Sequence, residues 1–190
     1  ETEIMIVEIE SSLNALKSGG ILIYPTDTIW GIGCDATSEE AVARIYRIKK
    51  RAESKSLVTL VNDCEMLKTY VPFIPEGVSE FLRYATKPTT VIYADPRGIA
   101  SNAISSDNTI AIRMPQNDFC VNLIRAFGKP IISTSANYSG SPSPTCFSDI
   151  DKELLAEADY IVNLSRHETQ ESASQIVKID QDGQIIFIRK

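Results

Sequence analysis

Apolar runs of strand length alternate along this chain with segments of helical period, and that alternation restricts the possible folds more than any other feature. It is the pattern expected when helices flank a sheet. The runs are rich in β-branched residues, which favour strands. We predict strands at residues 21–24, 57–61, 90–94, 109–113, 130–133, 160–163 and 175–179, followed by a hairpin that turns at Asp182-Gly183 and ends at Arg189. The predicted fold class is therefore α/β.

Capping signals delimit two of the helices. Thr37 and Glu40 have the spacing of a capping box, and the apolar positions that follow them repeat with a helical period. A second helix is predicted over residues 118–127, between Asn117 as the N-cap and Gly128 as the stop.

Two segments have the composition of loops. Residues 25–33 contain Pro25, Gly31 and Gly33, and residues 138–148 contain one glycine, two prolines and four serines. The second segment is either a mobile lid or an ordered surface connection.

Composition excludes several classes of protein. The length of 190 residues, with 43% apolar and 23% charged residues, suits one soluble domain spanning residues 1–190. The longest apolar runs, such as residues 57–61 and 185–188, are far shorter than the ~20 residues of a membrane-spanning helix. The amino end has neither the basic start nor the apolar run of a secretion signal, so we expect a cytoplasmic protein with no membrane contact. Its four scattered cysteines form no CxxC pair and predict reduced thiols.

The first candidate cluster is the segment from Tyr24 through Thr26, Asp27 and Thr28, where a predicted buried strand gives way to hydroxyls and a carboxylate. Ligands of open α/β sheets bind outside the carboxyl ends of the strands, so these side chains are candidates for a site. The same residues are equally typical of a turn followed by a helix cap.

The second cluster is basic and contains Lys49, Lys50 and Arg51 at the end of a predicted helix, with Lys55 just beyond. Bound phosphates require fixed positive charge, and alternate residues can converge where a helix unwinds. Basic residues in a last helical turn are also favoured by the helix dipole, so solvated capping charges are the alternative interpretation.

The third cluster runs from Ser133 to Asn137, again where a strand ends in hydroxyls and an amide that can bind phosphate or ribose oxygens. The alternative interpretation is that these groups form hydrogen bonds with their own backbone. Arg113 ends another predicted strand and can grip a carboxylate with two hydrogen bonds, or form a surface ion pair. His167, the single histidine, has no evident nucleophile near it in sequence and is predicted to be a surface residue.

These clusters, in this order and at these intervals, resemble the YrdC/TsaC family of threonylcarbamoyl-AMP synthases over nearly the whole chain. The resemblance rests on the Pro-Thr-Asp-Thr segment followed by Trp30-Gly31-Ile32-Gly33, on a Lys-x-Arg motif at Lys49 and Arg51, and on a Ser-x-Asn motif at Ser135 and Asn137. It implies a single α/β domain in which a twisted mixed sheet, flanked by helices, surrounds a concave basic cleft. A single-domain bacterial type is the nearer match.

The resemblance also implies a reaction. A nucleotidyltransferase of this family converts L-threonine, bicarbonate and ATP into threonylcarbamoyl-AMP and pyrophosphate, and the product serves to modify adenosine 37 of certain tRNAs. The in-line attack of one anion on another mainly requires positioning and neutralisation of charge. Lys49 and Arg51 are implied as the catalytic cations.

The remaining site residues are carried over position by position. The resemblance implies threonine contacts for Thr26, Arg113 and Ser174. It implies that ATP is bound by Lys49, Arg51, Lys55, Thr90, Ser133, Ser135, Asn137 and Arg189. Two positions depart from the family pattern, because Gln175 replaces a threonine and Lys55-Ser56-Leu57 replaces the more usual Asn-Pro-Leu or Lys-Gly-Leu.

Partners follow from the same resemblance. Mg²⁺ is expected to accompany ATP without a dedicated protein cage. A separate tRNA threonylcarbamoyl transferase complex would receive the product, so any binding of RNA by this chain would be weak. Two alternatives are a carbamoyl-adenylating enzyme of the same fold and a non-catalytic module that binds double-stranded RNA. The net charge of −6 counts against the RNA module.

Overall fold

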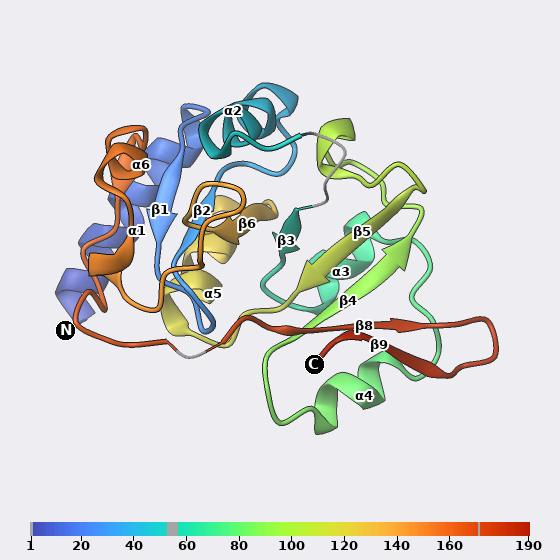
Figure 1. The fold of residues 1–190 in the computed structure, drawn as a ribbon. Coiled ribbons are helices and arrows are strands. Elements are labelled where there is room, and N and C mark those ends of the chain that lie inside the picture. The colour runs from blue at the N-terminus through green and yellow to red at the C-terminus, as the bar shows by residue number, and fades with distance from the viewer. Residues whose placement is uncertain (1, 53–56, 171) are drawn as a thin grey trace.

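The computed structural model describes residues 2–52, 57–170 and 172–190. Within them the strands form a mixed sheet in the order β7-β1-β2-β6-β3-β5-β4-β8-β9 (Figure 1). The strands are β1 (Leu22–Tyr24), β2 (Gly31–Gly33), β3 (Val58–Leu60), β4 (Thr89–Ala94), β5 (Thr109–Arg113), β6 (Ile131–Ser135), β7 (Tyr160–Ile161), β8 (Gln175–Ile179) and β9 (Ile185–Arg189). The predicted α/β fold with a mixed sheet is confirmed.

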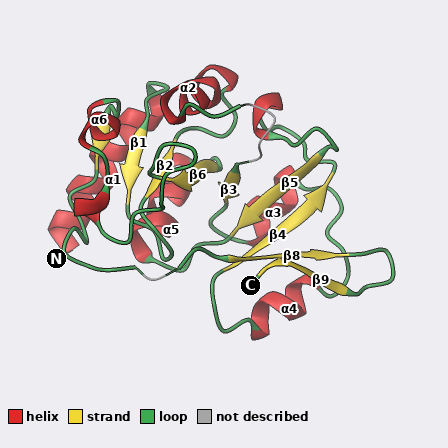
Figure 2. Cartoon of the chain, in the orientation of Figure 1, coloured by secondary structure: helices red, strands yellow, loops and turns green. Residues whose placement is uncertain are grey.

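Helices surround this sheet in two groups. The helices are α1 (Thr2–Lys17), α2 (Glu39–Lys49), α3 (Cys64–Tyr70), α4 (Val78–Tyr84), α5 (Asp118–Phe127) and α6 (Lys152–Ala156), with 3₁₀ turns η1 (Ser101–Ala103) and η2 (Phe147–Asp149). Figure 2 shows α1, α2, α5 and α6 around β1, β2 and β6, and α3 and α4 beside β4, β5, β8 and β9. None of the helices in the described ranges is both long and apolar enough to cross a membrane.

Strand β6 joins the two halves of the sheet. Its first residues pair with β3, with Ser133 opposite Val58, whereas its last residues pair with β2, with Ser135 opposite Gly31. We call β7, β1, β2 and β6 the first half of the sheet, and β3, β5, β4, β8 and β9 the second half. Because β6 belongs to both ladders, its polar carboxyl end lies where the two halves meet.

In the first half, both faces of the sheet are covered by helices. Leu22 and Tyr24 of β1 pack with residues of α1 and α5, such as Leu16 and Leu123. Ile23, which points to the opposite face, packs with α2 and α6. Successive side chains of a strand point to opposite faces, so a strand buried on both sides is apolar throughout.

In the second half, one face is covered by α3 and α4. Val91 and Ile112 on that face pack with Leu67 of α3 and Val78 of α4. Ile92 of β4 and Ala111 of β5, which alternate with these residues, point to the opposite face and are only partly buried. The alternation therefore leaves a partly open sheet face in the second half.

Most predicted boundaries agree with the structure, but two local predictions are wrong. Residues 31–33 form β2 rather than a loop, and Gly33 lies so close to β6 that a Cβ atom there would be 1.9 Å from the Ile132 carbonyl oxygen. Helix α2 begins after Ser38, whose hydroxyl accepts a hydrogen bond from the Ala41 amide. Thr37, the predicted cap, is bonded to the Asp35 carboxylate instead.

Candidate functional site

A pocket with a volume of about 360 Å³ lies where the two halves of the sheet meet. Segments far apart in the sequence contribute to it: the turn after β1, the residues after α2, the end of β6 and the β8–β9 hairpin. Its lining consists of Thr28, Ile29, Arg51, Leu57, Val58, Ile92, Ala111, Arg113, Ser133, Thr134, Ser135, Ser143, Ala173, Ser174, Ile176, Ile188 and Arg189.

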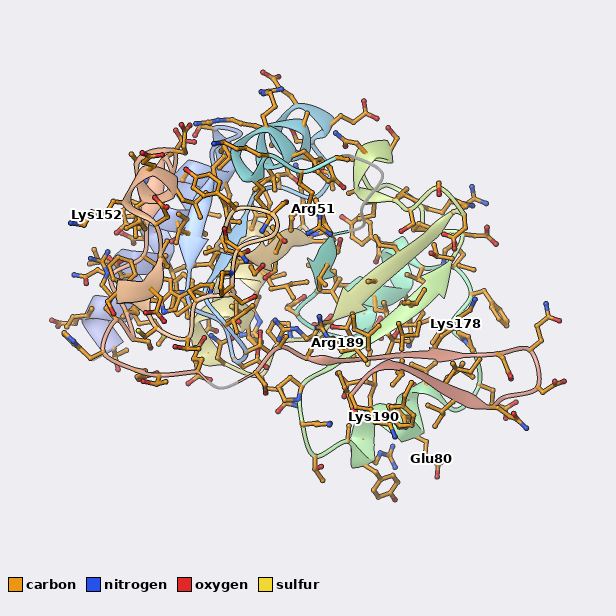
Figure 3. The ribbon with its side chains drawn as sticks, in the orientation of Figure 1. Arg51, Glu80, Lys152, Lys178, Arg189 and Lys190 are labelled. Atoms are coloured by element: carbon orange, nitrogen blue, oxygen red, sulfur yellow. The ribbon has the colours of Figure 1, made fainter. Side chains whose placement is uncertain are left out.

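The predicted site residues fall into two layers around this pocket. Those that line it are Arg51, Arg113, Ser133, Ser135, Ser174 and Arg189. Those that lie one hydrogen bond behind a lining residue are Lys49, Asn137, Thr90 and Thr26. Lys55 is outside the described residues. In Figure 3, Arg51 and Arg189 lie near the middle of the molecule, whereas Lys152 lies at its edge.

The end of helix α2 separates the two residues of the Lys-x-Arg motif. Lys50 adopts a left-handed conformation with φ 55°, and its amide donates to the last carbonyls of the helix. Lys49 points inward from the buried face of α2, and this turn brings Arg51 to the pocket. The amino group of Lys50 lies 4.9 Å from the centre of the Tyr138 ring. The two cations of the motif are therefore placed differently, with Arg51 in the pocket lining and Lys49 one hydrogen bond behind it.

Lys49 is 1% exposed and makes its contacts within the protein. Its amino group donates to the Ser135 carbonyl oxygen at 2.5 Å and to Asn137 Oδ1 at 3.1 Å. Burial, together with the positive charge of Arg51, lowers the pKa of Lys49 to about 7. The amine therefore ties the Ser-x-Asn motif to the end of α2 from behind the pocket wall.

Arg113 ends strand β5 and is 4% exposed. Its Nη1 forms an ion pair with Asp27, and its Nη2 donates to the Thr28 hydroxyl at 3.3 Å. The second oxygen of Asp27 accepts a hydrogen bond of 3.1 Å from the Gln116 amide. The guanidinium group is thus held at the pocket wall by the turn that follows β1.

Thr26 organises that turn. Its hydroxyl donates to the Ile29 carbonyl at 2.7 Å, accepts from the Thr28 amide at 3.0 Å, and lies 3.0 Å from the Thr28 hydroxyl. Side-chain bonds of this kind fix tight turns. Within the described residues, Thr28 rather than Thr26 reaches the pocket lining.

The β8–β9 hairpin contributes the opposite wall. Nε and Nη2 of Arg189 donate to the Ser174 carbonyl at 2.9 and 2.7 Å, and the hydroxyls of Thr90 and Ser174 share a bond of 2.7 Å. Burial and the nearby charge of Arg113 lower the pKa of Arg189. Gln175, the departure from the family pattern, points away and donates to the Thr89 hydroxyl at 2.7 Å.

The chemistry of the pocket follows from this lining. Three arginines and several hydroxyls face an apolar wall formed by the open sheet face, and no carboxylate is among the described lining residues. Such a pocket can hold an anion together with an apolar group.

Sequence reasoning did not single out Ser143, which comes from the loop of residues 138–148 and lines the pocket. No local motif distinguishes it from the other serines of that loop. His167 is exposed and lines a different cavity, with Phe147 and Arg166, as expected for a residue outside the site.

The fold and the pocket define an α/β protein with an arginine-lined pocket at the junction of the two halves of its sheet. Residues 14–190 match the family of Sua5, YciO and YrdC, described as "Telomere recombination". The chain belongs to this family.

Known relatives span most of the chain. It is 35% identical over 141 residues to a threonylcarbamoyl-AMP synthase of Hahella chejuensis, covering 73% of this chain and 77% of that one. It is 33% identical over 176 residues to a putative threonylcarbamoyl-AMP synthase of Methanocaldococcus jannaschii, covering 92% of this chain and 81% of that one. Sua5 of P. abyssi in complex with L-threonine superposes with a TM-score of 0.86 at 26% identity, and the match covers 95% of this chain and 53% of that one. The chain thus spans about half the length of that Sua5.

Proposed function

We propose that this protein is an L-threonylcarbamoyladenylate synthase that forms threonylcarbamoyl-AMP and pyrophosphate from L-threonine, bicarbonate and ATP. The observation that carries the proposal is the pocket in which Arg51, Arg113 and Arg189 converge with the hydroxyls of β6 and Ser174. The names of the relatives support the same activity.

In this reaction the amine of threonine combines with bicarbonate, losing water, to give N-carboxythreonine. A carboxylate oxygen then bonds to the α-phosphorus of ATP, and the bond to the β-phosphate oxygen breaks to release pyrophosphate. Both partners are anions, so the protein must hold them together and neutralise their charge. The reaction needs no covalent protein intermediate.

The lining suggests a division of roles. Arg51 and Ser135 come from neighbouring segments linked through Lys49, and we assign them to the phosphates of ATP. Arg113 and Ser174 are assigned to threonine, with the fork of Arg113 on its carboxylate. The apolar wall, including Ile92 and Ile176, offers a surface for the purine.

The predicted residues that lie behind this wall support it in the proposal. Lys49 supplies positive charge and fixes Ser135 and Asn137. Thr90 orients the Ser174 hydroxyl, and Thr26 shapes the turn that carries Thr28.

Mg²⁺ would enter with ATP. The described residues contain no group of three or more His, Cys, Asp or Glu side chains that could hold a metal ion, and the described lining has no carboxylate. Phosphate oxygens and water would therefore carry the ion, which neutralises phosphate charge when bound. The adenylate would pass to a separate tRNA threonylcarbamoyl transferase complex, so only weak contact with RNA is required.

Chromatography of reactions containing ATP tests the proposal. Threonylcarbamoyl-AMP and pyrophosphate should appear only when threonine and bicarbonate are both present. Faster adenylate formation from carbamoyl phosphate would favour the carbamoyl-adenylating alternative. Salt-sensitive retention of double-stranded RNA on a filter, with no adenylate formed, would favour the RNA-binding module.

A further inference from the structure

We propose that Asp27 is a positioning residue that holds the Arg113 guanidinium in the plane required to bind the carboxylate of the amino-acid substrate. This inference rests on the proposed function. In it, the Pro-Thr-Asp-Thr segment orients an arginine. We call Asp27 and Thr28, which contact the guanidinium group, the socket.

The contacts of Arg113 fix the orientation of its planar group. Nη1 pairs with Asp27 and Nη2 donates to Thr28, so consecutive residues of one turn hold both terminal nitrogens. Each terminal nitrogen carries two hydrogens, and one of each is used in these bonds. The remaining donors lie in a plane that the turn has set in advance, which is the arrangement that two-point recognition of a carboxylate needs.

The socket is itself held in place. The hydroxyl of Thr26 bonds to the amide of Thr28 and to the carbonyl of Ile29, closing the turn on itself. The second oxygen of Asp27 accepts from the Gln116 amide, which lies just beyond β5. Asp27 therefore connects the loop after β1 with the end of the strand that carries Arg113.

Because the ion pair is buried, the contribution of Asp27 to the orientation of Arg113, and so to threonine binding, should be large enough to detect. The side chains of Arg113 and Asp27 are 4% and 13% exposed. A buried guanidinium with its partner removed reorients toward other acceptors, because an uncompensated buried charge is costly. Preorganised binding groups lose affinity when their supporting contacts are removed.

Two effects of removing Asp27 have opposite signs, and this makes the inference testable. Loss of the carboxylate adds net positive charge to the pocket, which by itself would tighten binding of an anion. Loss of the socket lets the guanidinium turn, which weakens binding. The positioning role requires the second effect to exceed the first.

The test compares Asp27→Asn, Asp27→Glu, Arg113→Ala and the double variant Asp27→Asn/Arg113→Ala. The Asn variant keeps the size of the side chain but loses its charge. We expect it to raise KM for threonine by about tenfold or more, with kcat and KM for ATP changed by less than about threefold. The Glu variant, which keeps the charge, should recover part of the threonine affinity.

The double variant separates positioning from a general structural role. If Asp27 acts through Arg113, adding Asp27→Asn to Arg113→Ala should change threonine affinity by less than about twofold, because the group being oriented is already absent. Asp159→Asn is the matched control, since it removes the charge from the partly exposed Arg44–Asp159 pair away from the pocket. It should leave both KM values unchanged.

Calorimetric titration of each variant with L-threonine provides a direct reading of binding. Unchanged or tighter threonine binding by folded Asp27→Asn would overturn the inference. It would also be overturned if Asp27→Asn lowered threonine affinity equally in the wild type and in Arg113→Ala. If Asp27→Asn does not fold, unchanged threonine affinity of Asp27→Glu would overturn it too, because its longer side chain displaces the socket. Wild-type protein that binds no threonine would instead refute the proposed function.

Discussion

Lys49 combines a charge with nearly complete burial at the end of helix α2. Its amino group has acceptors at Ser135 and Asn137, but burial and the charge of Arg51 still lower its pKa to about 7. An unfolded lysine titrates near pH ~10.4. The unfolded chain therefore binds more protons than the folded chain at this residue between about pH 7 and pH 10.

From this difference we predict that Lys49 contributes more to stability as pH rises. The free energy of unfolding of the wild type, minus that of Lys49→Met, should increase between pH 7 and pH 10 by at most ~1.4 kcal/mol per pH unit. Below pH 7 both states of Lys49 are charged and the difference should level off. Urea unfolding at a series of pH values measures it, and a difference that stays constant across this window would contradict the prediction.

Arg51, by contrast, lines the pocket. We predict that Arg51→Ala lowers the rate of adenylate formation by roughly 10²- to 10³-fold, the usual effect of removing one group that stabilises transition-state charge. Circular dichroism should show an intact fold. Pyrophosphate release measures the rate, and turnover equal to that of the wild type would remove Arg51 from the site. Arg47→Ala, a change on the preceding helical turn outside the pocket lining, is the control.

Among the elements, strand β2 depends on a close approach of two backbones. A Cβ atom at Gly33 would lie 1.9 Å from the Ile132 carbonyl oxygen of β6. At Gly31 the nearest atom would be the Ser133 hydroxyl oxygen at 3.0 Å, and a side chain can move more easily than a backbone.

We therefore predict that Gly33→Ala destabilises the protein by at least ~1–3 kcal/mol through overpacking, and that Gly31→Ala costs clearly less. Chemical denaturation of both variants measures the two losses. Equal losses would mean that the β2–β6 spacing can relax, and the explanation from backbone contact would then fail.

The same elements show what sequence can and cannot predict. Strands β5 and β8 and helix α5 were predicted with their observed ends, because β-branched runs and a Gly128 stop are local signals. Strand β2 was missed because two of its three residues are glycines, whose role depends on a partner strand distant in sequence. Local pattern alone gave no means of detecting that contact.

The site was predictable to a similar degree. Motifs identified Arg51, Ser135 and Ser174, all of which line the pocket. Which residues form the lining and which lie behind it depends on side-chain direction after a turn or cap. Lys49 faces inward because it continues the buried face of α2. The direction of Arg51 instead depends on the left-handed Lys50, a conformation that has no signature in the sequence.

At the scale of the whole molecule, β9 leaves an apolar edge. It is the last strand of the sheet, and Ile185, Ile186, Phe187 and Ile188 are 39%, 46%, 45% and 55% exposed. Open apolar edges favour pairing with other chains.

We predict that Ile186→Lys raises the protein concentration at which self-association begins. Static light scattering over a concentration series measures the onset. Ile4→Lys is the matched control, because Ile4 is 58% exposed and lies on helix α1 rather than on a strand. If both substitutions raise this concentration equally, exposed hydrophobic surface alone explains the effect and the strand edge has no special role.

The pocket can form only late in the synthesis of the chain. Its walls come from the turn after β1 and from the β8–β9 hairpin, so Thr28 and Arg189 must be present together before the hollow can close. Contacts between such distant parts of a chain form slowly and late. If the pocket binds nucleotide as proposed, a nascent chain on the ribosome captures none until the segment that carries Arg189 has emerged from the exit tunnel.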